Sequence, residues 1–437
     1  MRNEIRERIE AVRRGEVPDG YTKTEIGILP EEWAVHPLSE ISTVIADQAG
    51  EAEFETMSIS AGIGFVNQAQ KFGKELSGKQ YSKYTVLRRG DFAYNKGNSK
   101  RYPQGCTYML REREIAAVPN VFECFRITKG VPEYYEQLFI HGFMNKQLAE
   151  KINHGVRDDG LLNLTDEDFY STRLPFPAAQ EQQRIAEILD ACDYAIRLKQ
   201  DLIKEKRNVK RSLMNGLLST AEMRLPGFKT DEIKDAKLAS LVDKIDAGTS
   251  VNSIEAETVQ YSSDRPFVLK TSCISNGAFI LSEIKEVAEQ DYGRVSCPIK
   301  AETLIVSRMN TPSLVGACAY CGNTKDNVFL PDRLWRVTLK DTVDGHWLNY
   351  LLNTSAYQDK LHLLASGTSN SMKNILKEDF LGLQIEVPSL EEQKAIAKVL
   401  MCLDQSIEAL ERELEQWQMK KKALMQLLLT GLVRVNA

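Results

Sequence analysis

The chain has 437 residues, 43% of them hydrophobic, and its 56 lysines and arginines against 61 aspartates and glutamates give a formal net charge of -5. This length allows two or three domains that each bury a core, and no apolar stretch approaches the ~18 residues of a membrane helix. Because the charged first residues do not resemble a secretory signal, we expect a cytoplasmic protein whose 8 scattered cysteines stay reduced.

The first part of the chain predicts a helical arm followed by a mixed globule. We expect the arm at residues 1–20 and an α/β globule at residues 21–177, where short β-like runs alternate with turns that contain Gly and Asn. A helical segment is expected at residues 134–151, and a glycine-containing loop follows at residues 155–160.

The next segment, residues 178–220, predicts a long helix. Its apolar residues recur at steps of three and four, although Lys199, Lys206 and Lys210 fall on the same stripe. A helix of about 39 residues is ~58 Å long, longer than the diameter of a ~150-residue globule, so it must project from one. The seam lysines suggest that part of the helix surface is left for another protein.

The rest of the chain repeats this plan. Residues 221–387 predict a second α/β globule, and residues 388–437 predict a second long helix that begins at a capping box of Ser389 and Glu392. Glu392 lies 211 residues after Glu181, and one offset aligns the two helices without a gap. The expected fold is therefore α+β, with two α/β globules in a pseudo-two-fold repeat, separated by two long antiparallel helices that form a coiled coil.

Motifs for catalysis are missing. Residues 73–79 fit the start of a P-loop, but Gln80 stands where a Ser or Thr must meet magnesium. Cys318 and Cys321 have the spacing of a metal knuckle, yet no second pair follows, and the 5 histidines show no ligand spacing. Neither an (Asn/Asp)-Pro-Pro-aromatic motif nor a Gly-x-Ser-x-Gly elbow occurs. We expect no catalytic residue and no metal site.

A basic and polar cluster at residues 88–101 is the clearest candidate for ligand binding. It carries five positive charges against one negative at the end of a predicted strand. Arg, Lys and Asn at a rigid loop suit phosphate contacts and base readout. Ser307, Arg308 and Asn310 hold the equivalent place in the second copy. The pair of clusters favours nucleic-acid binding over a solvated charged loop.

One helical motif closes each globule, starting at Pro177 and again at Pro388, and reads Pro-x-x-x-Glu-Gln-x-x-Ile-Ala-x-x-Leu-x-x-x-Asp-x-x-Ile. This doubled motif resembles the specificity subunit of type I restriction-modification systems. Residues 20–33 and 224–228 resemble the lead-ins to the first and second recognition domains of that family. The resemblance covers the whole chain.

The resemblance implies that each globule is a target recognition domain for one half of a bipartite double-stranded DNA target. It implies that the helices set the spacing and dock two methyltransferase subunits, and that motor-endonuclease subunits complete the complex. S-adenosylmethionine, ATP and Mg are then expected in the partner subunits, with no cofactor and no catalysis in this chain.

Individual contacts do not follow from the resemblance, because recognition domains vary within the family. From residue type and position we predict DNA contacts at Tyr94, Lys96, Asn98, Lys100, Arg101, Arg157, Ser307, Arg308, Asn310, Asn370 and Lys373. On the helices we predict partner-binding residues at Gln182, Ile185, Leu189, Ile196, Lys210, Gln393, Ile396, Leu400, Ile407 and Lys421.

Three other functions remain open from the sequence. The chain could be an adaptor whose helices dimerise and whose globules bind protein, a recognition subunit of another phage-defence assembly, or an enzyme with a divergent fold. An adaptor predicts no salt-dependent DNA affinity, whereas phosphate contacts make the affinity fall steeply with salt. The empty motif search disfavours the enzyme.

Overall fold

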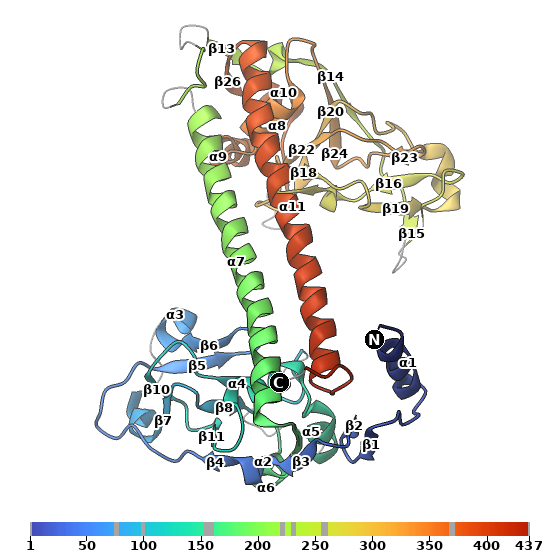
Figure 1. The fold of residues 1–437 in the computed structure, drawn as a ribbon. Coiled ribbons are helices and arrows are strands. Elements are labelled where there is room, and N and C mark those ends of the chain that lie inside the picture. The colour runs from blue at the N-terminus through green and yellow to red at the C-terminus, as the bar shows by residue number, and fades with distance from the viewer. Residues whose placement is uncertain are drawn as a thin grey trace. The chain divides into compact units, whose positions relative to one another are not determined.

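The computed structural model describes residues 2–73, 78–97, 101–152, 161–218, 223–228, 233–254, 261–366 and 372–435. The chain divides into two compact units: unit 1 comprises Met1–Gln200 with Glu413–Ala437, and unit 2 comprises Asp201–Arg412. The division falls inside both long helices, α7 (Ala179–Leu218, green in Figure 1) and α11 (Leu390–Leu428, red). Each unit therefore combines one globule with part of each helix.

Unit 1 is built on a four-stranded antiparallel sheet in the order β4-β11-β8-β9. Its strands are β4 (Ser42–Val44), β8 (Phe92–Asn95), β9 (Cys106–Met109) and β11 (Glu123–Ile127). Four two-stranded pairs surround it, β1 (Tyr21–Thr24) with β2 (Gly27–Pro30), β3 (Ala34–Pro37) with β12 (Arg173–Phe176), β5 (Met57–Ser60) with β6 (Gly64–Asn67), and β7 (Thr85–Arg88) with β10 (Ile115–Val118).

The helices of unit 1 join its globule to the long helices. The short ones are α1 (Arg2–Arg13), α2 (Leu38–Ile41), α3 (Gln68–Phe72), α4 (Pro132–His141), α5 (Asn145–Lys151) and α6 (Asp166–Tyr170). One core cluster contains Leu138 of α4, Leu189 of α7 and Leu428 of α11, all buried. The globule and its helix segments thus share a single hydrophobic core.

Unit 2 contains an equivalent sheet in the order β14-β24-β20-β22. Its strands are β14 (Val242–Ala247), β20 (Thr303–Ser307), β22 (Cys318–Cys321) and β24 (Leu334–Leu339). A second sheet, β15-β19-β16-β23, is formed by β15 (Ser253–Ile254), β16 (Phe267–Leu269), β19 (Ile284–Val287) and β23 (Val328–Phe329). The remaining elements are β13 (Lys234–Lys237) with β26 (Gln384–Val387), β17 (Ile274–Ser275) with β18 (Ala278–Phe279), β21 (Met309–Asn310) with β25 (Lys373–Asn374), and helices α8 (Gly345–Leu352), α9 (Ser355–Leu364) and α10 (Lys377–Leu381).

The two main sheets share one topology. In both, the spatial order takes the first, fourth, second and third strands of the sheet along the chain, and all pairs are antiparallel. The two units therefore build their main sheets in the same strand order. The units differ around it, because unit 2 has a four-stranded second sheet where unit 1 has separate pairs.

Three predicted helices are shorter than expected. The segment at residues 134–151 is broken at Gly142, whose φ of 75° ends α4 in a left-handed cap. In unit 2, the helical segment that corresponds to α4 and α5 is also broken, at Asn353 between α8 and α9. The last helix ends at Leu428, since Gly431 has a φ of 68° and accepts a hydrogen bond from the Tyr21 hydroxyl at 2.6 Å.

Ion pairs across the helices give their direction within each unit. In unit 1, Lys199 pairs with Glu413, and Lys421 donates to Asp193 at 2.6 Å. In unit 2, Arg207 pairs with Glu411 and Lys210 with Asp404, both at 2.5 Å. Numbers rise on α7 as they fall on α11, so the paired segments run antiparallel. The prediction that the seam lysines serve another protein is wrong for Lys199 and Lys210, because carboxylates of this chain bind them.

Candidate nucleic-acid interface

In unit 2, the fold brings the end of β20 next to a segment far along the chain. Arg308 follows β20, and its carbonyl accepts a hydrogen bond from the Ile375 amide at 2.9 Å. Asn310 of β21 pairs with Lys373 of β25 in antiparallel register. We call Arg308–Asn310 together with Lys373–Ile375 edge 2. Three predicted DNA-binding residues, Arg308, Asn310 and Lys373, thus lie together.

Unit 1 contains the same arrangement. The Lys96 carbonyl accepts a hydrogen bond from the Leu162 amide at 2.9 Å, and Gly97 forms an antiparallel bridge with Leu161. We call Asn95–Gly97 together with Leu161–Leu162 edge 1. In both units the residue after a central strand is held against the segment that follows a predicted glycine-containing loop. Edge 1 and edge 2 are therefore each built from distant parts of one globule.

Edge 2 presents an arginine that is held in place without an acidic partner. The Arg308 guanidinium lies over the Trp335 ring, 5.9 Å from its centroid. Its Nε is buried and has no hydrogen-bond partner, and the same holds for Oδ1 of Asn374. No ion pair of Arg308 occurs in the part of the chain that the structure describes. An arginine that is stacked but unpaired retains its donors for a phosphate or a base edge.

Edge 1 carries a neutralised cation in the equivalent place. The Lys96 ammonium pairs with Glu123 at 2.6 Å and with Asp166 at 3.1 Å, and its side chain is 12% exposed. Burial raises the pKa of Glu123, whereas a hydrogen bond with Glu123 lowers the pKa of Asp166. Lys96 therefore remains at the edge, but its charge is engaged within unit 1.

Two residues predicted to contact DNA, Tyr94 and Ser307, lie in the core instead. Tyr94 is 1% exposed, and its ring stacks on Phe169 with centroids 4.5 Å apart while its hydroxyl donates to the Gln104 carbonyl. Ser307 is also 1% exposed and accepts a hydrogen bond from Asn310 at 3.0 Å. Both side chains point inward from their strands, so they support the edges and do not face a ligand.

The other predicted contacts divide into one exposed residue and four outside the described structure. Arg101 is exposed, with its guanidinium 5.7 Å from the centroid of the Tyr102 ring, a position that suits a phosphate contact. The predictions at four further positions lie outside the described residues, namely Asn98, Lys100, Arg157 and Asn370.

The doubled Glu-Gln motif has a structural role in each unit. Gln182 accepts from the Val131 amide at 2.8 Å, at the start of α4, and Gln393 accepts from the Asp344 amide at 2.9 Å, at the start of α8. Both glutamines donate to the proline carbonyl that precedes the long helix. The motif thus attaches each long helix to a helix of its own globule.

The buried glutamates of the motif hold the two lead-in segments. Glu181 is 4% exposed and accepts hydrogen bonds from Trp33 at 2.9 Å and from Arg434 at 2.7 Å. Glu392 is 1% exposed and pairs with Arg224. The similarity of these segments to family lead-ins therefore has a physical cause, since each one supplies a donor to a buried carboxylate.

Most helix residues predicted to bind partners instead pack within this chain. Ile185, Leu189, Ile396, Leu400 and Ile407 are buried, as are both glutamines, and Ile196 is half-buried. Lys421 and Lys210 bind Asp193 and Asp404, and these two pairs are reciprocal, because each residue corresponds to one 211 positions away in the other pair. The prediction for this set is wrong in its premise, since a heptad seam identifies the buried face of a helix and not its free face.

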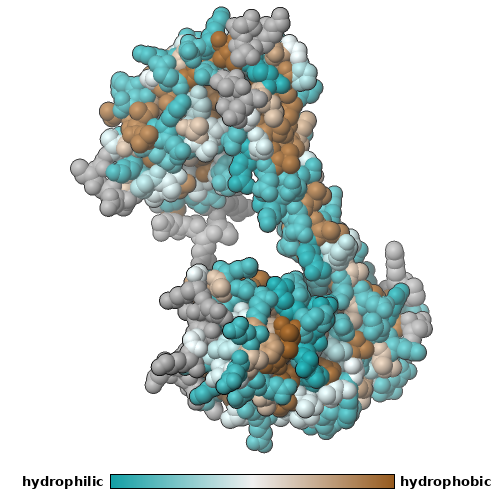
Figure 2. Space-filling model, turned by 90° about the vertical axis from the view of Figure 1, so that its left-hand side faces the viewer, coloured by the Kyte–Doolittle hydropathy of each residue, from teal (hydrophilic) through white to brown (hydrophobic). Residues whose placement is uncertain are grey.

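The free face of α7 carries apolar side chains that the sequence prediction missed. Tyr194 is 58% and Leu198 50% exposed in unit 1, and Leu202 is 45% and Val209 41% exposed in unit 2. Figure 2, seen from the left side of Figure 1, shows hydrophobic patches among hydrophilic surface. The signal in sequence was the step of four from Tyr194 to Leu198, off the seam.

The side chains that could bind a metal are not gathered into a site in the part of the chain that the structure describes. Among them, no group of three or more His, Cys, Asp and Glu is placed to hold a metal ion. Burial raises the pKa of the Cys318 thiol to about 12 and that of Cys321 to about 11, which opposes the thiolate form that metals bind. None of the described helices is long and apolar enough to cross a membrane.

Comparisons with known proteins identify the class. The family model for the type I restriction modification DNA specificity domain matches residues 126–206 and 236–416, more than half of the chain. The chain belongs to this family and is a specificity subunit of a type I restriction-modification system.

Named relatives and solved structures agree with this assignment. Two relatives come from Methanocaldococcus jannaschii. The putative type I restriction enzyme MjaX specificity subunit is 26% identical and covers 96% of this chain and 97% of its own length, and the MjaVIII specificity subunit is 29% identical over 67% and 70%. The fold is similar to the type I restriction-modification S subunit from M. genitalium, with a TM-score of 0.55 at 12% identity, covering 93% of this chain and 97% of the other. It is also similar to a chain from a structural study of assembly and conformational transition in a type I R-M system, with a TM-score of 0.53 at 16% identity, covering 93% and 99%.

Proposed function

We propose that this specificity subunit reads a bipartite double-stranded DNA target, with edge 1 at one half-site and edge 2 at the other. The observation that carries the proposal is the repeated construction of the edges. Each one holds a cation-bearing strand end against a distant segment by backbone hydrogen bonds, at Lys96 with Leu162 and at Arg308 with Ile375. Rigidly placed basic side chains are what base-edge readout requires.

Within this proposal, edge 2 makes the stronger direct contact. The Arg308 guanidinium lies over the face of Trp335, and no carboxylate of the described residues pairs with it. A guanidinium in this state can donate two parallel hydrogen bonds to a guanine or to a phosphate. Lys96 has the equivalent place in edge 1 but is bound by two carboxylates, so we assign it a weaker role.

The long helices are proposed to set the distance between half-sites. With 40 residues, α7 is about 60 Å long at 1.5 Å per residue, and one turn of DNA is about 34–36 Å. The two recognition domains are proposed to be related by a pseudo-two-fold axis, with the helices forming a coiled coil. The reciprocal pairs Asp193–Lys421 and Lys210–Asp404 support this symmetry.

The free helix faces are proposed to dock two methyltransferase subunits. Their exposed apolar residues, Tyr194 and Leu198 in unit 1 and Leu202 and Val209 in unit 2, offer the surface that a partner would cover. Methylation with S-adenosylmethionine, and ATP- and Mg-dependent translocation and cleavage by motor-endonuclease subunits, are assigned to the partners. This chain is proposed to contribute recognition without catalysis.

The test is a methylome of a host that carries this chain with its methyltransferase. We expect a split adenine-methylated motif, of which exchanging residues 225–387 for those of a relative changes one half. A continuous motif, or both halves changing together, would contradict the two-reader proposal. Loss of methylation with unchanged DNA binding in a Tyr194→Asp, Leu198→Asp variant would locate the docking face.

A further inference from the structure

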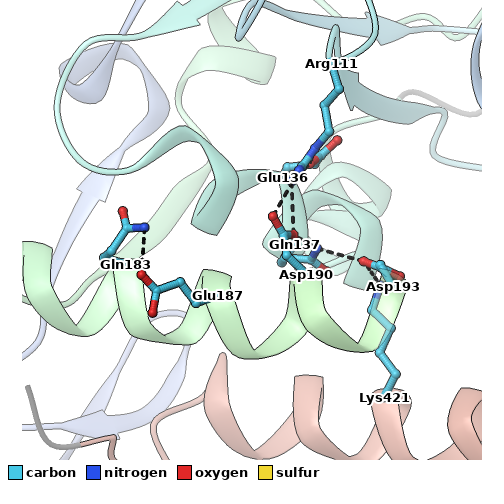
Figure 3. Close-up of polar contacts among 8 residues, drawn as sticks. All are labelled: Arg111, Glu136, Gln137, Gln183, Glu187, Asp190, Asp193 and Lys421. Carbon is cyan, nitrogen blue, oxygen red and sulfur yellow. Dashed lines mark hydrogen bonds and ion pairs between the residues drawn. The ribbon is translucent and has the colours of Figure 1, made fainter. Parts of the chain in front are cut away.

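A polar network joins the first globule to both long helices inside unit 1 (Figure 3). Arg111, in the loop after β9, donates from Nε to Glu136 of α4 at 2.5 Å. Its two terminal nitrogens donate to the two oxygens of Asp190 of α7, at 2.9 and 3.1 Å. The guanidinium therefore connects the globule to α7 by a two-bond contact that fixes the angle between the groups.

The network continues to the second helix through an amide. Gln137 donates from Nε2 to Asp190 and to Asp193, both at 3.0 Å. Asp193 in turn accepts from Lys421 of α11 at 2.6 and 2.7 Å. Charge-assisted hydrogen bonds thus run without a break from the globule across α7 to α11, as the dashed lines in Figure 3 show.

The geometry of this network suits a role in orienting the globule on α7 more than a role in stabilising the folded unit. Its charged side chains line a cleft of about 750 Å³, and Arg111 is 39%, Asp190 32% and Asp193 38% exposed. The partly exposed pair of Arg111 and Asp190 contributes little to the folding free energy, whereas the pair of Arg111 and Glu136 includes a carboxylate that is only 8% exposed. Gln137 is 1% exposed. Its Nε2 donates to the two carboxylates on α7, while its buried Oε1 has no hydrogen-bond partner.

The network and edge 1 lie at opposite ends of the paired strands β8 and β9. Arg111 follows β9, which pairs along its length with β8, and Asn95 at the start of edge 1 is opposite Cys106 of β9. A change in the angle between this sheet and α7 therefore moves edge 1 with it. Arg111 is placed to set that angle.

Unit 2 does not repeat the network. Met401 stands on α11 where α7 has Asp190, so an arginine has no carboxylate there to bind with two bonds. Asp404 instead accepts from the Tyr350 hydroxyl at 2.6 Å and from Lys210 at 2.5 Å. The two-bond arginine contact belongs to the first recognition domain alone among these equivalent positions.

We propose that Arg111 is a positioning residue that holds the first recognition domain at one angle on α7 and so restricts the spacer length between half-sites. This inference rests on the proposed function. One base pair more in the spacer moves a half-site by about 3.4 Å and turns it by about 35°. A domain held by a directional contact rejects that change, and a domain released from it adapts to it.

The experiment uses the full chain assembled with its methyltransferase. The substrates carry the split motif of the wild-type protein with its own spacer, or with one base pair more or less. The test variant is Arg111→Gln with Glu136→Gln, because the double change leaves no buried unpaired carboxylate. The matched control is Arg113→Gln, since Arg113 pairs at 2.5 Å with Glu55 inside the globule, and no hydrogen bond or ion pair among the described residues joins it to α7 or α11.

We expect the double variant to lower the preference for the native spacer by about fivefold or more, with both half-site sequences unchanged, because a small misplacement of a reading group has large effects. The Arg113 control should stay within about twofold of wild type. Unchanged spacer preference in a folded, active double variant overturns the proposal. If the double variant does not assemble, Asp190→Asn removes the charge and one of the two oxygens that the two-bond contact needs, keeps an oxygen that can accept from Gln137, and is judged by the same criterion. A wild-type protein that methylates no split motif overturns the proposed function first, and this inference with it.

Discussion

The two units hold a basic residue by equivalent backbone hydrogen bonds but surround it with different side chains. Edge 1 and edge 2 are held by the same kind of backbone hydrogen bond after equivalent strands, yet Lys96 is bound by two carboxylates while Arg308 is stacked on Trp335 without an acid. The attachments to the helices differ as well, through Arg111 in unit 1 and Tyr350 in unit 2. The two units therefore share the backbone hydrogen bonds that hold each edge together. They differ in the side chains at that edge and in the partners of those side chains.

The largest expected effects are on the stability of each unit, and they test whether each edge is supported by aromatic residues of its own unit. Phe169 of α6 stacks on Tyr94 beneath edge 1, and Phe380 of α10 packs against Trp335 beneath edge 2, with centroids 5.6 Å apart. We expect Phe169→Ala and Phe380→Ala each to lower the free energy of unfolding of its own unit by about 3–5 kcal/mol. Calorimetry with limited proteolysis measures this. Cleavage of the same unit in both variants would contradict separate cores.

The next effect concerns the two equivalent cations. Arg308→Ala should weaken specific DNA binding by about 1–3 kcal/mol and relax one position of one half-site. Lys96→Ala should cost less than about 1 kcal/mol, because its charge is already engaged within unit 1. Binding titrations at several salt concentrations, together with the methylated motif, measure both. Equal losses for the two variants would remove the proposed asymmetry between the edges.

A smaller effect is expected from a variant that makes the cation of edge 1 less engaged with carboxylates, as the cation of edge 2 is. Asp166→Asn removes one of the two carboxylates that bind Lys96, and Asp166 is 69% exposed. We expect DNA affinity to rise about twofold to fivefold, with a steeper salt dependence, because an ammonium that is bound by Glu123 alone retains more of its charge for a phosphate. Asp168→Asn is the matched control, since Asp168 lies on the same helix and accepts from Thr165. An equal gain in the control would show a general charge effect.

The helices and the central strands could be predicted from the sequence because their signals are local. The period of three and four placed α7 and α11 within a few residues of their starts, and the capping by Ser389 is present, with Oγ accepting from the Glu392 amide at 3.4 Å. The strand ends at Lys96 and Arg308 were also located correctly next to their strands.

The direction of individual side chains could not be predicted. In β8, three successive residues, Phe92, Ala93 and Tyr94, are all buried, so no alternation distinguishes the face toward a ligand. Gln182 and Gln393 resemble solvent-facing helix residues, but their partners Val131 and Asp344 lie 51 and 49 residues away. Such non-local hydrogen bonds leave no periodic trace in the sequence.

The smallest effect compares a buried carboxylate of unit 1, Glu136, with a partly exposed carboxylate of unit 2, Asp246, through the pH dependence of their contributions to stability. In unit 1, burial raises the pKa of Glu136, whereas in unit 2 hydrogen bonds with Lys244 and Arg336 lower the pKa of Asp246. In the window above the ordinary glutamate value and below the raised pKa, folded Glu136 binds more protons than the unfolded chain does. The stability contributed by this residue therefore falls as the pH rises through that window.

We expect Glu136→Gln to remove this dependence, so that its melting temperature rises relative to that of wild type as the pH increases above the ordinary glutamate value. Asp246→Asn should behave in the opposite way. The lowered pKa of Asp246 contributes stability above the ordinary aspartate value and loses it as the pH falls through the folded pKa, so this variant should be weaker at neutral pH and approach wild type in acid. Melting curves across this range measure both variants. Parallel curves for wild type and Glu136→Gln would show that Arg111 fully compensates the burial of Glu136, and unit 1 would then differ from unit 2 in geometry alone.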